Sequence, residues 1–280
     1  GSFGDGLYDA ADQNTLTDTP LMADSRTGRV IVTDIETNEQ GLWVANFNSD
    51  NPLHLLSNDG TWESYDLNGR ASEILQIAVS GNIWIRDNNS SISIYNPELD
   101  EVTVVNANNS DLPSSIINDI SIDLDDEVWV ATERGVAFFP SASVEISNFN
   151  TAILPVFENN FLFRDEVINS ITTDPGNRKW IGNTTGAWLL EEAGESLVTR
   201  FTAENSPLPS DNVLDITINP QNGEVFFVTD RGMVSFRSDA TESTAFHSDV
   251  KIFPNPVRPN YNGLVGFNGL ATDVRLKITD

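Results

Sequence analysis

The chain has 280 residues, with 15 Lys and Arg against 42 Asp and Glu, which gives a formal net charge of −27. A field of this sign repels phosphate backbones, so we expect no nucleic-acid partner. The absence of cysteine excludes disulfides, thiolate catalysis and cysteine-ligated zinc, and no run of apolar residues is long enough to span a bilayer as a helix.

An aromatic residue recurs along the chain at intervals of 41, 45, 51 and 46 residues. These anchors are Trp43 (GLWVAN), Trp84 (GNIWIRD), Trp129 (DEVWVAT), Trp180 (RKWIGN) and Phe226 (GEVFFVTD). A glycine follows each of the last three anchors six residues later, at Gly135, Gly186 and Gly232. A near-constant period of this length indicates one structural unit repeated along the chain.

Each unit contains about four short apolar runs separated by turns rich in Asn, Asp, Gly and Pro, and no amphipathic helix is evident. An apolar run precedes each anchor, another follows each glycine (GVAFF, GAWLL, GMVSF), and residues 102–106 and 197–201 close two of the units. Four strands in 40–50 residues are typical of a β-propeller blade. We therefore predict an all-β fold, a β-propeller of four-stranded blades.

One loop occurs twice, as NSDLPSSIINDI at residues 109–120 and as NSPLPSDNVLDI at residues 205–216. In a propeller, such a loop carries the chain from the outer strand of one blade to the inner strand of the next, so it repeats because the blade repeats. Residues 6–13 (GLYDAADQ) are predicted to be the third strand of a partial blade. With the Gly1-Ser2 start, this indicates a trimmed piece of a longer protein and an incomplete ring.

The four tryptophan anchors share one repeat position, so we predict that they pack between neighbouring blades. Trp62 and Trp188 lie off that position and are the candidates for stacking on a ligand, with packing as the alternative for both. The inner-strand positions near Asp119, Asn169 and Asp215 point to the expected mouth or channel, and we predict that blade geometry explains their recurrence. The recurring glycines are expected to permit a positive φ or a close backbone approach.

Groups suited to catalysis are few. The only histidines, His54 and His247, stand in unrelated contexts, and we expect both to be incidental surface or loop residues, which leaves little material for a triad or a histidine metal site. Asp123, Asp125 and Asp126 could hold Ca²⁺ through hard oxygen ligands, although an ordinary turn between strands also explains them. We predict no enzyme activity, and no cofactor apart from this calcium candidate.

The segments DLDDEVWVATERG (123–135) and DPGNRKWIGNTTG (174–186) resemble the two-component-regulator propeller repeat, and the resemblance covers roughly residues 30–240. That family forms seven-bladed periplasmic sensors of hybrid histidine kinases and related exported propellers. The resemblance therefore implies seven blades, of which about five to six are represented here. Trp43 and Trp84 depart from the pattern because no glycine follows them six residues later.

Residues 249–280 resemble the start of the C-terminal sorting domain of the type IX secretion system, which opens with a strand and a Pro-Asn-Pro motif. The motif residues are Pro254, Asn255 and Pro256. An Ig-like β-sandwich needs more residues than this segment supplies, so the sandwich is expected to stop after its first strands. We predict a propeller over residues 1–245, followed by an incomplete sorting domain over residues 246–280.

Propeller repeats followed by such a tail resemble the cell-surface accessory proteins of type IX secretion. The resemblance implies an exported, outer-membrane-associated scaffold without catalysis. Its expected partners are a sortase-like peptidase and outer-membrane barrel proteins, and its expected role is to help process cargo and attach it to lipopolysaccharide. Because the chain is acidic, contact with that anionic glycolipid would require bridging divalent cations or neutral sugars.

Two alternatives stay open at this point. One is a secreted cargo propeller that carries the same tail and binds or cleaves glycans. The other is a periplasmic, oligosaccharide-sensing ectodomain of a hybrid two-component histidine kinase, for which a different sandwich and a transmembrane helix would follow the last blade. Fold resemblance alone does not separate these functions, because one fold supports many kinds of site.

Overall fold

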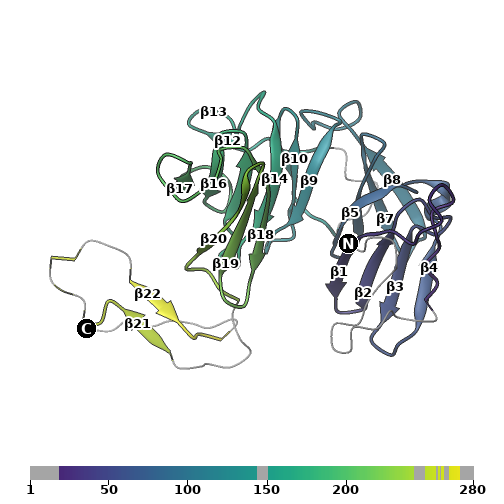
Figure 1. Ribbon diagram of the computed structural model, residues 1–280, viewed down its shortest axis with the longest axis horizontal. Coiled ribbons are helices and arrows are strands. Elements are labelled where there is room, and N and C mark those ends of the chain that lie inside the picture. The colour runs from purple at the N-terminus through teal and green to yellow at the C-terminus, as the bar shows by residue number, and fades with distance from the viewer. Residues whose placement is uncertain are drawn as a thin grey trace.

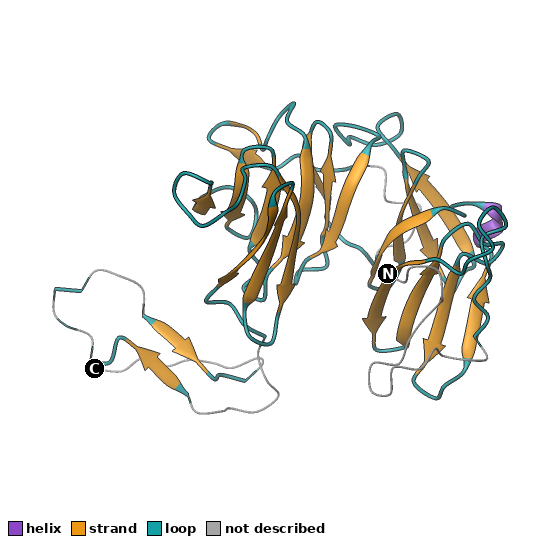
Figure 2. Ribbon diagram, viewed as in Figure 1, coloured by secondary structure: helices purple, strands orange, loops and turns teal. Residues whose placement is uncertain are grey.

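A computed structural model describes residues 19–143, 151–242, 250–256, 258, 260, 261 and 265–271, and Figure 1 shows their arrangement. Antiparallel sheets make up the described part of the chain, together with a single 3-10 turn, η1 (Leu67–Gly69) (Figure 2). Within that part, no helix is long and apolar enough to cross a membrane. The predicted strand at 6–13 and His247 lie outside the described residues.

Numbered along the chain, the first, second and fourth of the five large sheets have four strands each, paired in chain order. The first consists of β1 (Val32–Asn38), β2 (Gly41–Asn46), β3 (Leu53–Ser57) and β4 (Trp62–Tyr65). The second consists of β5 (Ile74–Val79), β6 (Ile83–Asp87), β7 (Ile92–Asn96) and β8 (Glu101–Val105). The fourth consists of β14 (Ile168–Thr173), β15 (Lys179–Asn183), β16 (Gly186–Leu190) and β17 (Leu197–Phe201).

The third and fifth sheets have three strands each. The third consists of β9 (Ile117–Ile122), β10 (Val128–Thr132) and β11 (Gly135–Phe139), and the fifth of β18 (Val213–Asn219), β19 (Glu224–Thr229) and β20 (Gly232–Arg237). In the third sheet, a single bridge between Phe138 and Ile153 takes the place of the fourth strand. The chain then forms a small hairpin, β12 (Val156–Phe157) and β13 (Asn160–Phe161).

The five sheets stand side by side around a common axis, as propeller blades do (Figure 1). The first strand of each sheet contacts the first strand of the next, in the order β1, β5, β9, β14, β18. The first strand of each blade is therefore the inner strand, and the last is the outer strand. This confirms the predicted all-β propeller of four-stranded blades, with an arc of five blades in the described residues and two departures from four strands.

The four tryptophan anchors are fully buried, and each belongs to a core cluster shared with the following blade. Trp43, for example, packs with Ile74 and Ile85 of the second blade. Burying a large ring between two sheets removes much apolar area from water, so the prediction that the anchors hold blades together is confirmed. Phe226, at the fifth anchor position, is only half-buried, because no described blade covers that face of β19.

The repeated loop has the same local structure in both copies. Ser110 Oγ donates to the carbonyl of Asn106, and Ser206 Oγ donates to the carbonyl of Thr202, each at 2.7 Å. One copy connects outer strand β8 to inner strand β9, and the other connects β17 to β18. The predicted role of the loop as the link between blades is confirmed.

Beyond the fifth blade, β21 (Lys251–Phe253) and β22 (Gly266–Asn268) form a separate two-stranded hairpin (Figure 1). Pro254, Asn255 and Pro256 directly follow β21. A cavity of about 510 Å³ lies between this hairpin and the turns at the near end of the fourth and fifth blades. The boundary predicted after residue 245 falls outside the described residues.

Candidate functional site

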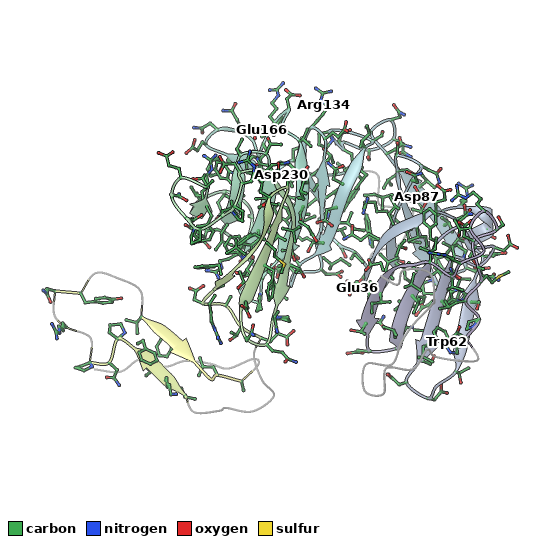
Figure 3. All side chains as sticks on the ribbon, in the orientation of Figure 1. Glu36, Trp62, Asp87, Arg134, Glu166 and Asp230 are labelled. Atoms are coloured by element: carbon green, nitrogen blue, oxygen red, sulfur yellow. The ribbon has the colours of Figure 1, made fainter. Side chains whose placement is uncertain are left out.

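The inner strands line an open cavity of about 770 Å³ along the axis of the arc. Its volume falls in the range of about 300–1,000 Å³ that is typical of small-molecule sites. Figure 3 shows Glu36 on the side of the first blade that faces this opening. The acidic residues that line the cavity are Asp34, Glu36, Asp119, Asp174, Asp215 and Glu242. The axis is therefore the candidate binding site of the propeller.

A β-bulge near the start of every inner strand shapes the wall of this cavity. The strand register shifts at the same place in all five blades, and the extra residue turns the polar side chain after it toward the neighbouring blade. We call these side chains the belt residues. They are Asp34, Gln76, Asp119, Ser170 and Asp215.

The belt residues connect each blade to the next by one repeated hydrogen bond. The side chain of each belt residue accepts a hydrogen bond from a main-chain N–H of the next blade. The donor is the residue that directly follows the belt residue of that next blade. The four bonds run from Ile77 N to Asp34 Oδ2 (2.8 Å), from Ile120 N to Gln76 Oε1 (3.2 Å), from Ile171 N to Asp119 Oδ2 (2.8 Å) and from Ile216 N to Ser170 Oγ (3.1 Å). Buried main-chain donors at the blade junctions thus find acceptors.

Side chains of the belt also bond to one another. Gln76 Nε2 donates to Asp119 Oδ1 at 2.6 Å. The Ser170 hydroxyl lies 3.0 Å from Asp119 Oδ2 and 3.3 Å from Asp215 Oδ1, and it has one proton to donate between them. Asp119 therefore ties the second, third and fourth blades together, whereas Asp215 is exposed at the end of the arc.

The bulge residues themselves add a second row of bonds between blades. Thr33 Oγ1 donates to the Ile74 carbonyl (2.8 Å), Asn118 Nδ2 to the Ile168 carbonyl (2.7 Å) and Asn169 Nδ2 to the Val213 carbonyl (2.7 Å). The recurrence of polar residues such as Asn169 at these positions therefore comes from blade geometry, as predicted. Leu75 and Leu214 occupy the same position in β5 and β18 and cannot donate in this way.

The wall of the cavity is electrostatically negative. Burial raises the pKa of Asp119 to about 6, despite the hydrogen bonds that it accepts, and the nearby charge of Asp215 adds to the rise. Burial also raises the pKa of Asp34. The guanidinium of Arg86 lies close to the belt and donates from Nε to Gln76 Oε1 at 3.2 Å. Such a wall favours neutral polar or cationic groups over anions.

The two tryptophans predicted to stack on a ligand lie away from the cavity. Trp62 is on outer strand β4, at the far edge of the first blade (Figure 3), with its ring edge-on to His54. Trp188 is on β16, where the Arg200 guanidinium lies 4.1 Å from its ring centroid and Phe163 packs edge-on. The structure does not bring the two rings together, and one face of Trp188 already has a partner.

The three carboxylates predicted as a calcium candidate have separate partners. Asp123 Oδ2 accepts from Lys179 Nζ at 3.0 Å and from Trp129 Nε1 at 3.1 Å, with the Asp123 and Lys179 side chains fully buried. Asp125 accepts from Asn177. Asp126 accepts from the hydroxyls of Ser80, Ser141 and Ser143. Within the described residues, no group of three or more acidic or histidine side chains is placed to hold a metal ion.

The buried Lys179 escaped sequence analysis. Its ammonium also donates to the Asn177 carbonyl at 2.7 Å and lies 4.9 Å from the centre of the Trp129 ring. The signal that could have found it is its place directly before an anchor, where the other blades have apolar residues. These are Leu42, Ile83, Val128 and Val225. A lysine in a position that is otherwise apolar points to a buried partner of opposite charge.

The prediction that His54 is a surface or loop residue is wrong. It is fully buried in β3, a strand with a neighbour on each side, and its Nδ1 lies 2.9 Å from Ser64 Oγ. Burial lowers the pKa of His54 to about 4, since a charged imidazole is disfavoured away from water. The histidine is therefore neutral in the folded chain at ordinary pH.

His54 should make stability depend on pH. The folded chain keeps the ring neutral down to about pH 4, whereas the unfolded chain protonates it below about pH 6.5. Between these values the unfolded state binds more protons, so the free energy of unfolding attributable to His54 rises with pH, by up to about 3 kcal/mol. Urea unfolding at pH 4.5–7.5 should show a flatter profile for His54→Leu than for the wild type. Parallel stability profiles of the wild type and His54→Leu would contradict the lowered pKa of His54.

Comparisons with known proteins identify the fold. No family model matches the chain, and no curated protein matches it. Among solved structures, PorZ of Porphyromonas gingivalis is similar over 97% of this chain, with a TM-score of 0.69 and 23% identity. PorZ is described as an essential bacterial surface component of the type-IX secretion system, and this chain spans 41% of its length.

A second solved structure is similar over a smaller part of the chain. It is the extracellular domain of a protein assigned to the hybrid two-component systems of B. thetaiotaomicron. It matches 78% of this chain with a TM-score of 0.55 and 22% identity, and the match covers 28% of that protein's chain. The chain thus shares its propeller fold with a surface component of a type-IX secretion system and with the extracellular domain of a protein assigned to the hybrid two-component systems.

Proposed function

We propose that this chain is a non-catalytic binding propeller of the bacterial cell surface, acting in the type IX secretion apparatus. The observation that carries the proposal is the match to PorZ over 97% of the chain, a share large enough to include both the blades and part of the tail. The Pro254–Pro256 motif directly after β21 supports the same assignment.

The geometry favours a role in binding. The belt hydrogen bonds connect neighbouring inner strands, so the wall of the axial cavity is already formed without a ligand, as is usual for small-molecule sites. Its acidic lining suits a neutral sugar or a cationic segment of a partner protein. The processing and transfer of cargo would then be carried out by partners, a sortase-like peptidase and outer-membrane barrel proteins, while the propeller holds them or the cargo in place.

A second candidate rests on the other structural match. The similarity to an extracellular domain of a hybrid two-component system favours a sensor that binds an oligosaccharide on the axis. That match covers less of the chain and has the lower TM-score. We therefore place it second.

The test is a pull-down of the full-length tagged protein from solubilised outer membranes of the source bacterium, with mass spectrometry of the proteins that co-purify. Recovery of a sortase-like peptidase together with an outer-membrane barrel protein is the expected result. Release of the protein into the medium without its tail would instead identify a secreted cargo. Recovery with a histidine kinase domain in the same polypeptide would identify a sensor.

A further inference from the structure

A buried lysine and a buried carboxylate meet at the junction of the third and fourth blades. Lys179 is the first residue of β15, and Asp123 directly follows β9 in the turn to β10. Lys179 Nζ lies 3.0 Å from Asp123 Oδ2. Among the ion pairs of the described residues, only this one has both side chains fully buried. The two groups are therefore in contact at a place that water does not reach.

An ammonium and a carboxylate in contact contain all the atoms of an amide bond and of one water molecule. The lysine nitrogen can bond to Asp123 Cγ while the bond from Cγ to Oδ2 breaks. Of the three ammonium protons, one stays on the amide nitrogen and two leave with Oδ2 as water. The reaction requires no oxidant, reductant or other co-reactant, so the pair is sufficient for it.

Burial favours the amide over the ion pair. In water, hydration stabilises a separate ammonium and carboxylate, but folding has already removed this hydration from both groups. Condensation replaces two buried charges by one neutral amide. The fold also holds the reacting groups together, and effective concentrations in well-oriented intramolecular reactions can reach about 10⁵–10⁸ M.

The main chain around Asp123 is placed to assist the attack. Asp123 Oδ1 accepts from the main-chain N–H groups of Asp125 and Glu127, both at 2.9 Å. When the nitrogen adds to Cγ, negative charge develops on Oδ1, where two fixed N–H donors stabilise it as an oxyanion hole does. The oxygen that leaves is Oδ2, which faces the ammonium.

The surrounding polar groups have partners after the bond has formed. The amide carbonyl oxygen is Oδ1, which keeps its two main-chain donors. The amide N–H keeps the Asn177 carbonyl, to which Nζ donates at 2.7 Å. Trp129 Nε1 loses Oδ2 but keeps the Glu127 carboxylate: burial raises the pKa of Glu127, and the hydrogen bond from the Trp129 indole lowers it. The junction thus accommodates an amide without leaving these buried donors unpaired.

The fourth blade contains the same turn with a different cation. Asp174 stands six residues before its tryptophan anchor, as Asp123 does, and its Oδ1 accepts from the main-chain N–H groups of Gly176 (2.8 Å) and Arg178 (3.0 Å). Its Oδ2 lies 2.7 Å from Arg178 Nη2. A guanidinium stays protonated in proteins, so it cannot act as the nucleophile. The lysine is what distinguishes the junction of the third and fourth blades.

We propose that Lys179 and Asp123 condense to an intramolecular isopeptide bond, which joins the third and fourth blades covalently. The ion pair is the state from which the bond forms, and the bond forms after folding, because only the folded chain removes the pair from water. In a chain without cysteine, the bond supplies a covalent cross-link that no disulfide can provide. It lies between blades and is separate from the axial cavity.

The test is mass spectrometry of the purified 280-residue chain after prolonged incubation at neutral pH. The intact mass should be lower than the sequence mass by one water molecule. After denaturation and digestion with trypsin, fragmentation should find residues 87–134 joined to residues 179–200 through Asp123 and Lys179. The Lys179→Met variant has no amine at this position and should keep its full sequence mass.

The same digest contains a control that does not depend on the stability of a variant. Asp174 and Arg178 fall in one tryptic peptide, residues 165–178, which should keep its full mass because its cation is a guanidinium. An intact mass equal to the sequence mass would overturn the proposal. Water loss that fragmentation assigns only to another site, such as a succinimide at Asp59 before Gly60, would also overturn it.

Discussion

Asp119→Ala is expected to lower the free energy of unfolding by about 3 kcal/mol. The substitution removes the acceptor for Ile171 N–H, Gln76 Nε2 and the Ser170 hydroxyl at the junction of three blades. Each buried donor left without an acceptor costs about 1–3 kcal/mol, and the relief from burying a carboxylate offsets part of the total. Equilibrium urea unfolding at pH 7, followed by tryptophan fluorescence, measures the change.

The matched control is Asp215→Ala, at the same repeat position in the last blade. Asp215 is exposed, and its one interblade hydrogen bond among those described is the 3.3 Å contact with Ser170 Oγ. Its loss should cost less than about 1 kcal/mol. Equal destabilisation by the two substitutions would show that the belt does not hold the blades together, and that the effect comes from some general property of an aspartate on an inner strand.

Asp123→Ala is expected to destabilise the chain by about 3–5 kcal/mol, because it leaves the fully buried ammonium of Lys179 without its counter-ion. Lys179→Met should cost less than Asp123→Ala does. In that variant Asp123 keeps the Trp129 indole N–H and the main-chain N–H groups of Asp125 and Glu127 as donors, while methionine fills much of the same space. Urea unfolding of both variants and of the double variant gives the coupling between the two side chains.

The same variants also test the calcium candidate. Lys179 already neutralises Asp123, so we expect the folded chain to bind Ca²⁺ no more tightly than the unfolded chain does. Addition of Ca²⁺ or of a chelator should therefore leave the thermal midpoint of the wild type unchanged. A calcium-dependent rise of the midpoint in the wild type that is absent in Asp123→Ala would contradict this. It would show that the turn holds a metal ion as well as the lysine.

Much of the fold follows from patterns within a single blade. The structural roles of the aromatic anchors and of the repeated loop are encoded by residues close to one another in the sequence. They can therefore be predicted from a single sequence. For the same reason, the outer strand predicted at 197–201 coincides with β17, and the one predicted at 102–106 is displaced by one residue from β8 (Glu101–Val105). The third blade departs from the pattern because Ile153 forms only one bridge before the chain turns into β12.

The site was harder to predict. Asp119, Asn169 and Asp215 were predicted to lie on inner strands near the channel, and they do, but Asn169 occupies the bulge position whereas the two aspartates occupy the belt position. The different surroundings of Asp119 and Asp215 were not predicted, because each belt residue bonds to a strand about 43–52 residues further along the chain. Trp62 and Trp188 stood out as tryptophans off the repeat, yet the partner of Trp188, Arg200, is brought to it by the pairing of β16 with β17.

The sequence by itself determined that the chain is a β-propeller, where its blades begin, which aromatic residues hold neighbouring blades together and which loops connect them. Periodicity carries this information, because every blade must solve the same packing problem with similar residues. Only the tertiary structure decided which polar groups are buried and what satisfies them. It placed His54 in the core, paired Lys179 with Asp123 and gave the belt its acceptors, because each of these depends on a contact between segments that no local pattern links.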